Sequence, residues 1–266
     1  MKIAALNIYP IKGCRGVGLK TSVVDRLGLV DDRRLMLVDN DSRFISQREM
    51  PRLATLRPAL DHGVLTVRAP GIEPIQLQVD ADGSTRAVAV WGNHGILASD
   101  QGDEAARWFS GAIGESCRLV YFGPQARNRV DPEYSPRPDA ETAFTDGYPI
   151  MAVVQESLDD LNTRLSDPVP MERFRPSIVV SGAAAWSEDN WTTIEFGSLR
   201  CDVVKPCARC VVTATDQVSG ARHPRQEPLR TLAGFRTIPG TGAIFGQNIV
   251  PQSTGTVRVG DEVRSG

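Results

Sequence analysis

Short runs of alternating apolar and polar residues, each closed by turn-forming residues, recur along this chain. Clear examples are KIAALNIYP (2–10), GVLTVRAPG (63–71) and GTVRVGDEVRS (255–265). An alternation with a period of two places the apolar side chains on one face of an extended strand. Gly260 and Asp261 interrupt the last run, as expected where two strands reverse direction tightly. Because the strands do not alternate regularly with helices, we predict a mainly β fold with a few helices, of mixed β/α character, rather than a doubly wound sheet.

Three segments show helical spacing instead. Apolar residues in 105–113 recur at intervals of three and four, and Ser99 or Asp100 is expected to cap that helix. A capping box at 157–160 predicts the start of a second helix, with one face formed by Leu158, Leu161 and Leu165. A third, short helix is expected over 227–235.

The length of 266 residues allows two domains that share the β character. A polar stretch with little periodicity contains Pro132, Pro136 and Pro138 and is typical of a surface linker. We therefore predict an N-terminal domain at 1–125, a linker at 126–146 and a C-terminal domain at 147–266, with an N-terminal strand that could pack with the second domain.

Charge and hydropathy exclude several classes of protein. The chain has 30 basic and 32 acidic residues, spread along its length, and a formal net charge of −2. This balance argues against a nucleic-acid-binding protein, so any anion site must be local. The N-terminal apolar stretch is broken by Asn7, Pro10 and Lys12, which leaves no signal-peptide core, and no run is long enough for a membrane span. We expect a cytoplasmic protein without a membrane partner.

The sharpest local feature is KPCARC (205–210), which brings two of the five cysteines together. The β-branched residues at 211–213 predict a strand after Cys210, a context that differs from the helix start of thioredoxin-type pairs. Twelve residues separate Cys210 from His223, as in part of a zinc-finger motif, but a second histidine is missing. The spacing alone leaves open whether Cys207 and Cys210 are functional or are simply buried thiols.

Several motifs, taken together and in order, resemble one known family. They are NIYPIKGCRG (7–16), DRRLMLVD (32–39), FISQREMPRLA (44–54), FRPSIVVSG (174–182), KPCARCVVTATDQVSG (205–220), EPLRTL (227–232), FGQNIV (245–250) and VGDEV (259–263). In this combination the chain resembles the MOSC family, and within it the amidoxime-reducing branch, which has mitochondrial and bacterial members. The resemblance implies a MOSC β-barrel packed against an N-terminal β-barrel-like domain.

The resemblance also implies a set of site residues. Cys210 becomes the thiolate ligand of molybdenum, a role that suits a soft sulfur donor, and Cys207 becomes structural. Asn248 is implied near the metal, where the mitochondrial relative has tyrosine, and Gly13 replaces a serine of that relative. The residues expected to contact the pterin cofactor and its phosphate are Lys12, Gly13, Arg34, Gly147, Tyr148, Arg175, Ser177, Ala208 and Arg209.

The implied activity is the reduction of N-hydroxylated compounds, such as hydroxylamines, amidoximes or N-hydroxylated bases, to amines or amidines by a molybdenum-cofactor enzyme. The chain lacks the cysteine spacing of a ferredoxin domain, so a separate ferredoxin-like or other small redox protein, with its reductase, is the expected electron donor. The alternative is a molybdenum-cofactor carrier or a sulfur-transfer protein with a persulfide on Cys210. Pyridoxal phosphate binding is a further property that the resemblance leaves open.

Overall fold

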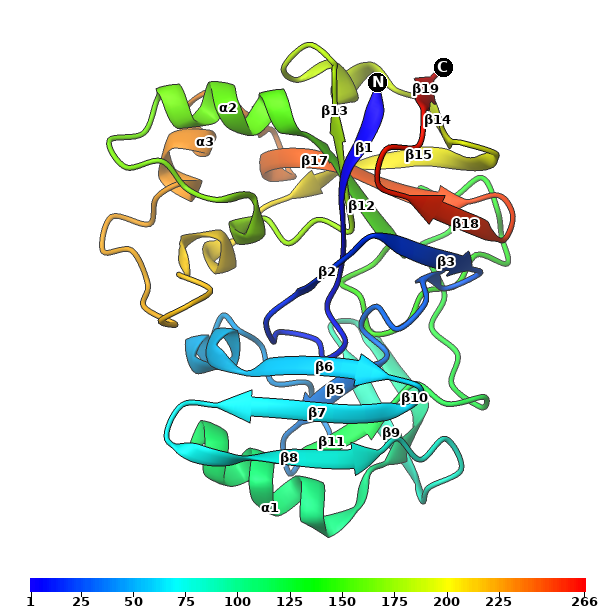
Figure 1. Cartoon of the computed structure of the whole chain (residues 1–266), viewed down its shortest axis with the longest axis vertical. Helices are drawn as coiled ribbons and strands as arrows, with labels where there is room; N and C mark the ends of the chain where they lie inside the picture. Colours follow the sequence, from blue (N-terminus) through cyan, green and yellow to red (C-terminus); the bar gives the residue numbers. More distant parts are fainter.

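The computed structural model describes all 266 residues and arranges them in two β-rich halves, one above the other in Figure 1. The mainly β fold predicted from the alternating runs is confirmed. The first strand, β1 (Lys2–Ile8), belongs to the upper half, after which the chain enters the lower half and returns. The two termini consequently lie close together at one end of the molecule (Figure 1).

The upper half is built on a nine-stranded sheet. Its strands are, in spatial order, β19 (Val263–Ser265), β14 (Thr193–Phe196), β15 (Leu199–Ala208), β17 (Gly242–Pro251), β12 (Ile150–Val154), β13 (Ile178–Ser181), β1 and β2 (Val17–Leu19), with β16 (Thr237–Ile238) paired to β17. Only β12 and β13 run parallel. All five residues of β12 are buried, as expected for a central strand that is covered on both faces.

Three smaller sheets complete the β structure. They are β5 (Leu35–Val38), β11 (Arg118–Tyr121), β10 (Asn93–Asp100) and β9 (Thr85–Val90); β6 (Arg57–Asp61), β7 (Val64–Ala69) and β8 (Ile72–Gln78); and β18 (Gly255–Arg258), β3 (Thr21–Asp25) and β4 (Gly28–Leu29). The first two form the lower half together with one helix (Figure 1). The third joins a strand from near the C-terminus to two from the N-terminal region.

The helices are α1 (Gly102–Ile113), α2 (Gln155–Thr163) and α3 (Leu229–Phe235), with 3₁₀ turns η1 (Pro51–Thr55), η2 (Met171–Arg173), η3 (Ser187–Asn190) and η4 (Val211–Ala214). The expected capping box of the second helix is wrong. This helix follows β12 directly, so Ser157 lies inside it, where its hydroxyl donates to buried Glu188 at 2.8 Å, and Leu165 lies beyond its end.

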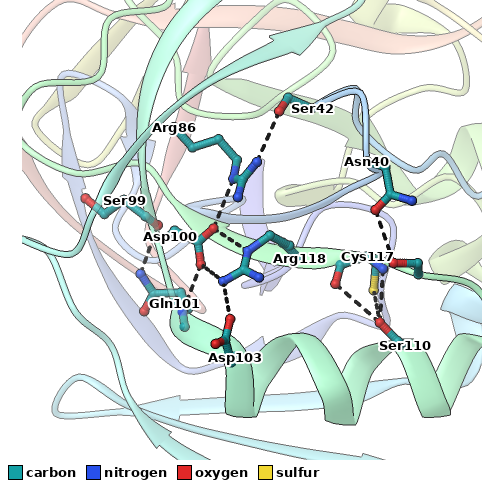
Figure 2. A network of polar contacts seen from close by, with 12 residues as sticks. Asn40, Ser42, Arg86, Ser99, Asp100, Gln101, Asp103, Ser110, Cys117 and Arg118 are labelled. Carbon is teal, nitrogen blue, oxygen red and sulfur yellow. Dashed lines mark hydrogen bonds and ion pairs between the residues drawn. The ribbon is translucent and has the colours of Figure 1, made fainter.

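The start of α1 is fixed by a polar network around Asp100 (Figure 2). Oδ1 of Asp100 accepts the N–H of Gly102 at 2.9 Å, although the residue at the N-cap itself is Gln101. The same carboxylate accepts from Arg118 Nε at 2.5 Å and from Arg86 Nε at 3.0 Å. Asp100 thereby joins β9, β10, β11 and the helix into one unit.

The stretch at 126–146 has no helix or strand, but it is not the simple surface linker that its polarity predicts. Ala126, Val130, Ala143 and Phe144 are buried, three of them in the core between β9, β10 and β11. These few apolar residues anchor the segment to the lower half, and its polar side chains make the remaining contacts.

Candidate active site

A cavity of about 420 Å³ lies between the two halves and is lined from both of them. Most of the residues expected at the site line it: Lys12, Gly13, Gly147, Tyr148, Arg175, Ala208, Arg209, Cys210 and Asn248. Arg34 and Ser177 do not. The structure therefore brings together side chains that are up to 236 positions apart in the chain, from 12 to 248.

The floor of the cavity is formed by neighbouring strands of the large sheet. Lys205 in β15 is paired with Asn248 in β17, and Asn248 is paired on its other side with Met151 in β12. These three residues therefore form a row across the sheet. The side-chain amide of Asn248 makes no hydrogen bond within the chain, which leaves its donor and acceptor free toward the cavity.

Cys210 lies just after β15, at the edge of this floor. The strand expected to follow it is wrong: Cys210 is instead the N-terminal flanking residue of η4, and its carbonyl oxygen accepts from the N–H of Thr213 at 3.1 Å and from its hydroxyl at 2.9 Å. The cysteine pair is therefore followed by a 3₁₀ turn and not by a strand. Cys210 is partly exposed, in contrast to the buried Cys14, Cys117 and Cys201.

Arg209 ties the cysteine pair to the opposite wall. Its Nη2 donates to the carbonyl oxygen of Phe174 at 2.6 Å, and its Nη1 lies 2.9 Å from the sulfur of Cys207. Its Nε is buried and has no hydrogen-bond partner within the chain. Phe174 stacks in turn on Phe245 of β17, with ring centroids 3.9 Å apart. These contacts hold Arg209 in place immediately before Cys210.

Two arginines share the ring of buried Tyr9 at one side of the cavity. The guanidinium carbons of Arg33 and Arg175 lie 4.5 Å and 4.1 Å from its centroid. Arg33 is paired with Asp32 at 2.5 Å, whereas Arg175 donates to neutral Gln217 at 3.2 Å. Burial lowers the pKa of Arg175 to about 10, and burial raises that of Tyr9 to about 12.

The structure corrects the choice of arginine in the DRRL motif. Arg34 donates twice to the carboxylate of Asp25, at 2.8 Å and 2.9 Å, and points away from the cavity that its neighbour Arg33 lines. Ser177 lies behind the wall, fully buried, where its hydroxyl donates to Asp32 at 3.2 Å. Both residues support the site from outside the cavity.

A lysine, an aspartate and a tryptophan meet at the third side. Lys12 forms an ion pair with Asp146, whose Oδ1 also accepts the indole N–H of Trp91 at 3.0 Å. Burial lowers the pKa of Lys12, and the Asp146 carboxylate partly offsets this effect. The Lys12 ammonium and the Trp91 N–H lower the pKa of Asp146, whose side chain is 72% exposed, well below its usual range. Asp146 is therefore ionised near neutral pH.

The cavity is strongly positive although the chain as a whole is slightly negative. Six of its lining residues are basic and one is acidic: Lys12, Arg33, Arg48, Arg175, Lys205 and Arg209 against Asp146. Such a concentration of cations in a concave, partly desolvated site favours an anionic ligand.

Several lining residues were not singled out from the sequence. Three of them lie inside motifs that resemble the family: Arg33, Arg48 and Lys205. The motifs therefore indicate the segments that form the cavity, although they do not indicate these individual side chains. Asp146 and Trp91 carry no signal of their own in the sequence. None of the three histidines lines the cavity, and Nδ1 of His223 accepts two backbone N–H groups of its own turn at 3.3 Å.

Comparison with known proteins agrees with this two-part arrangement. Residues 1–116 match the MOSC N-terminal beta barrel domain and residues 139–264 match the MOSC domain. The chain is 37% identical to mitochondrial amidoxime reducing component 2 of Rattus norvegicus, over 98% of this chain and 82% of that protein. It belongs to the MOSC family.

Two further proteins are similar to this chain. Mitochondrial amidoxime-reducing component 1 of Homo sapiens is 32% identical over 98% of this chain and 82% of its own length. The solved structure of the YUAD protein from Bacillus subtilis covers 98% of this chain and 93% of its own at 10% identity, with a TM-score of 0.45. The named relatives are mitochondrial, and the cytoplasmic location stays a prediction. No helix here combines the length and apolarity of a transmembrane segment.

Proposed function

We propose that this MOSC protein uses a molybdenum cofactor to reduce N-hydroxylated compounds, with electrons from a separate small redox protein. The observation that carries the proposal is the position of the Cys210 sulfur in a cavity where cationic side chains outnumber anionic ones by six to one. The names of its relatives, as amidoxime-reducing components, support the substrate class. Neither the matched families nor these names point to pyridoxal phosphate.

The residues of the cavity fit a pterin cofactor with a terminal phosphate. Arg33 and Arg175 offer planar guanidinium groups for the phosphate oxygens. Cys210 offers the soft sulfur donor that a metal bound to dithiolene sulfurs accepts. The volume of about 420 Å³ is in the range of small-molecule and cofactor sites. When bound, the molybdenum cofactor supplies a two-electron redox change and an open coordination position.

The protein residues hold, orient and screen the reactants. The overall reaction breaks the N–O bond, releases the oxygen as water and consumes two electrons and two protons; the redox protein supplies the electrons. Asp146 is a poor proton donor because its pKa is low, and no histidine lines the cavity, which leaves Lys12, Tyr148 and solvent as proton sources there. Asn248, whose amide in the cavity floor has no partner within the chain, would hydrogen-bond the N-hydroxylated group.

The test combines cofactor content with turnover. Wild type and Cys210→Ala are expressed in a host that makes the pterin cofactor, and molybdenum, pterin and reduction of benzamidoxime by reduced viologen are measured. The matched control is Cys207→Ala, which removes a sulfur from the same cavity wall. We expect Cys210→Ala to lose molybdenum and turnover while it retains pterin, and the control to keep all three.

Two results would contradict the proposal. Undiminished molybdenum in Cys210→Ala would exclude thiolate ligation by this residue. Sulfane sulfur that depends on Cys210 in a metal-free wild type would instead support the sulfur-transfer alternative.

A further inference from the structure

The cations of the cavity differ in whether their charge is already balanced. Lys12 is paired with Asp146 and Arg33 with Asp32. Lys205 has no carboxylate within ion-pair distance, and the same holds for Arg48, Arg175 and Arg209, which contact an aromatic ring, a neutral amide and a backbone carbonyl instead. The Lys205 ammonium lies over the ring of Tyr134, 3.6 Å from the centroid, so the side chain is oriented without being neutralised. A full positive charge therefore remains available at this point of the cavity wall.

Lys205 and the arginine pair lie on opposite sides of the cavity floor. The row from Lys205 through Asn248 to Met151 spans three adjacent strands, and β13, which follows Arg175, is the next strand beyond. Three strand spacings correspond to ~14 Å. A phosphate held by Arg33 and Arg175 would therefore be well separated from the ammonium of Lys205. The cofactor does not need this lysine to balance its phosphate charge.

Tyr134 is held in place by its own segment. Arg137, three residues further along, donates from Nε to Asp202 of β15 at 2.9 Å. The segment at 126–146 thus crosses from the lower half to the strand that carries Lys205. Asp131 and Glu133 belong to the same segment, but neither forms an ion pair with Lys205. The lysine and its aromatic support are consequently a fixed feature of the cavity wall.

We propose that Lys205 and Asn248 form a substrate subsite that favours N-hydroxylated compounds with a carboxylate on the end away from the N–O bond. The single ammonium of Lys205 binds the carboxylate as a point charge, and the adjacent amide of Asn248 contacts the body or N-hydroxylated end of the same molecule. This inference rests on the function proposed above, and it narrows the substrate class from N-hydroxylated compounds in general to anionic ones.

The experiment compares two substrates that differ mainly in charge. Holoenzyme reduces 4-carboxybenzamidoxime and its neutral analogue 4-carbamoylbenzamidoxime with reduced viologen at low ionic strength. A charged hydrogen bond is worth at least about 1.5 kcal/mol, so we expect kcat/KM to favour the carboxylate roughly tenfold. The preference should decrease as salt screens the charge.

Three variants locate the effect. Lys205→Met removes the charge from a side chain of similar length and should abolish the preference through a higher KM for the carboxylate substrate, with molybdenum and pterin contents as in wild type. Asn248→Asp leaves the lysine in place but gives it a carboxylate partner across the strands, so the preference should again disappear. Lys20→Met removes an exposed lysine outside the cavity and should behave as wild type.

The outcomes separate the two proposals. If wild type reduces both compounds equally well, or if Lys205→Met leaves the preference intact, the subsite is refuted while the reductase function stands. If Lys205→Met loses molybdenum or pterin, the lysine serves the cofactor and the subsite is likewise refuted. If the molybdenum-loaded wild type reduces neither compound, the reductase function fails and the subsite fails with it.

Discussion

The replacement Asp32→Asn tests whether one buried carboxylate joins the two halves at the cavity. Asp32 is 1% exposed. Its Oδ1 accepts the N–H of Tyr9 at 2.8 Å, and its Oδ2 accepts from Arg33 at 2.5 Å and from the hydroxyl of Ser177 at 3.2 Å. Arg33 in turn donates to the carbonyl oxygen of Arg175 at 3.1 Å. Residues from both halves therefore depend on this carboxylate.

The size of the effect follows from the donors that asparagine can still satisfy. If its oxygen keeps the Tyr9 N–H, its amide nitrogen takes the position of Oδ2. The Ser177 hydroxyl can rotate to accept from this nitrogen, but the Arg33 guanidinium cannot accept. The loss is then one charged hydrogen bond plus a buried guanidinium without its counter-ion, or about 3 kcal/mol of unfolding free energy. If the amide is flipped, its oxygen keeps the Arg33 and Ser177 donors, and the loss is the Tyr9 N–H bond together with the counter-ion of Arg33, which is of the same order.

Urea denaturation followed by tryptophan fluorescence gives the unfolding free energy, and a thermal scan should show a decrease of about 6–10 °C. Asp41→Asn is the matched control, since the exposed Asp41 side chain accepts no hydrogen bond. A loss below about 0.5 kcal/mol, the range of ordinary surface changes, would refute the idea that Asp32 joins the halves.

Two further predictions concern the framework around the site. Gly246→Ala should lower the unfolding free energy by about 3 kcal/mol in urea denaturation, because its φ is +76° and a Cβ would lie 2.4 Å from Val153 Cγ1. Gly242→Ala on the same strand, with φ +92° and open space around the new Cβ, should lower it by only about 1 kcal/mol. Equal losses in the two variants would argue against the clash. Burial alone would raise the pKa of Asp100, but hydrogen bonds from Arg118 and the Gly102 N–H lower it (Figure 2). Asp100→Asn should therefore lose about 3 kcal/mol above pH ~4, and the difference from wild type should vanish as pH falls through the lowered pKa of the folded state. The control Asp103→Asn removes one exposed contact to Arg118 and should change stability little at any pH. A loss in Asp100→Asn that does not depend on pH would contradict the role of the ionised carboxylate.

The sequence was most informative where a pattern has a single structural solution. The alternating runs at both ends of the chain do form strands, and the helical spacing at 105–113 does form α1. Six of the eight motifs that resemble one family contribute residues to one cavity, whereas those at 227–232 and 259–263 do not. Periodicity and family motifs are thus reliable for elements and for the location of the site.

The errors arose where a local turn takes the place of the element that residue preferences predict. The β-branched residues after Cys210 favour a strand, but β15 ends at Ala208 and the Cys210 carbonyl is instead bound by Thr213. The choice between Arg33 and Arg34 depends on a turn in which Arg33 has φ +51°, a conformation uncommon for a residue other than glycine. No feature of the local sequence indicates which arginine faces the cavity after such a turn.

The division of the site between the halves explains why neither half could provide it alone. The chain forms β1 in the large sheet and then places Tyr9 and Lys12 at the junction before it enters the lower half. It returns to the junction at Arg33, and again at Asp146 before β12 begins. Each return adds a cation or its counter-ion to the wall opposite Cys210. A separated upper half would keep Cys210 with three of the cations but would lose Lys12, Arg33 and Arg48, so the proposed cofactor binding should depend on both halves at once.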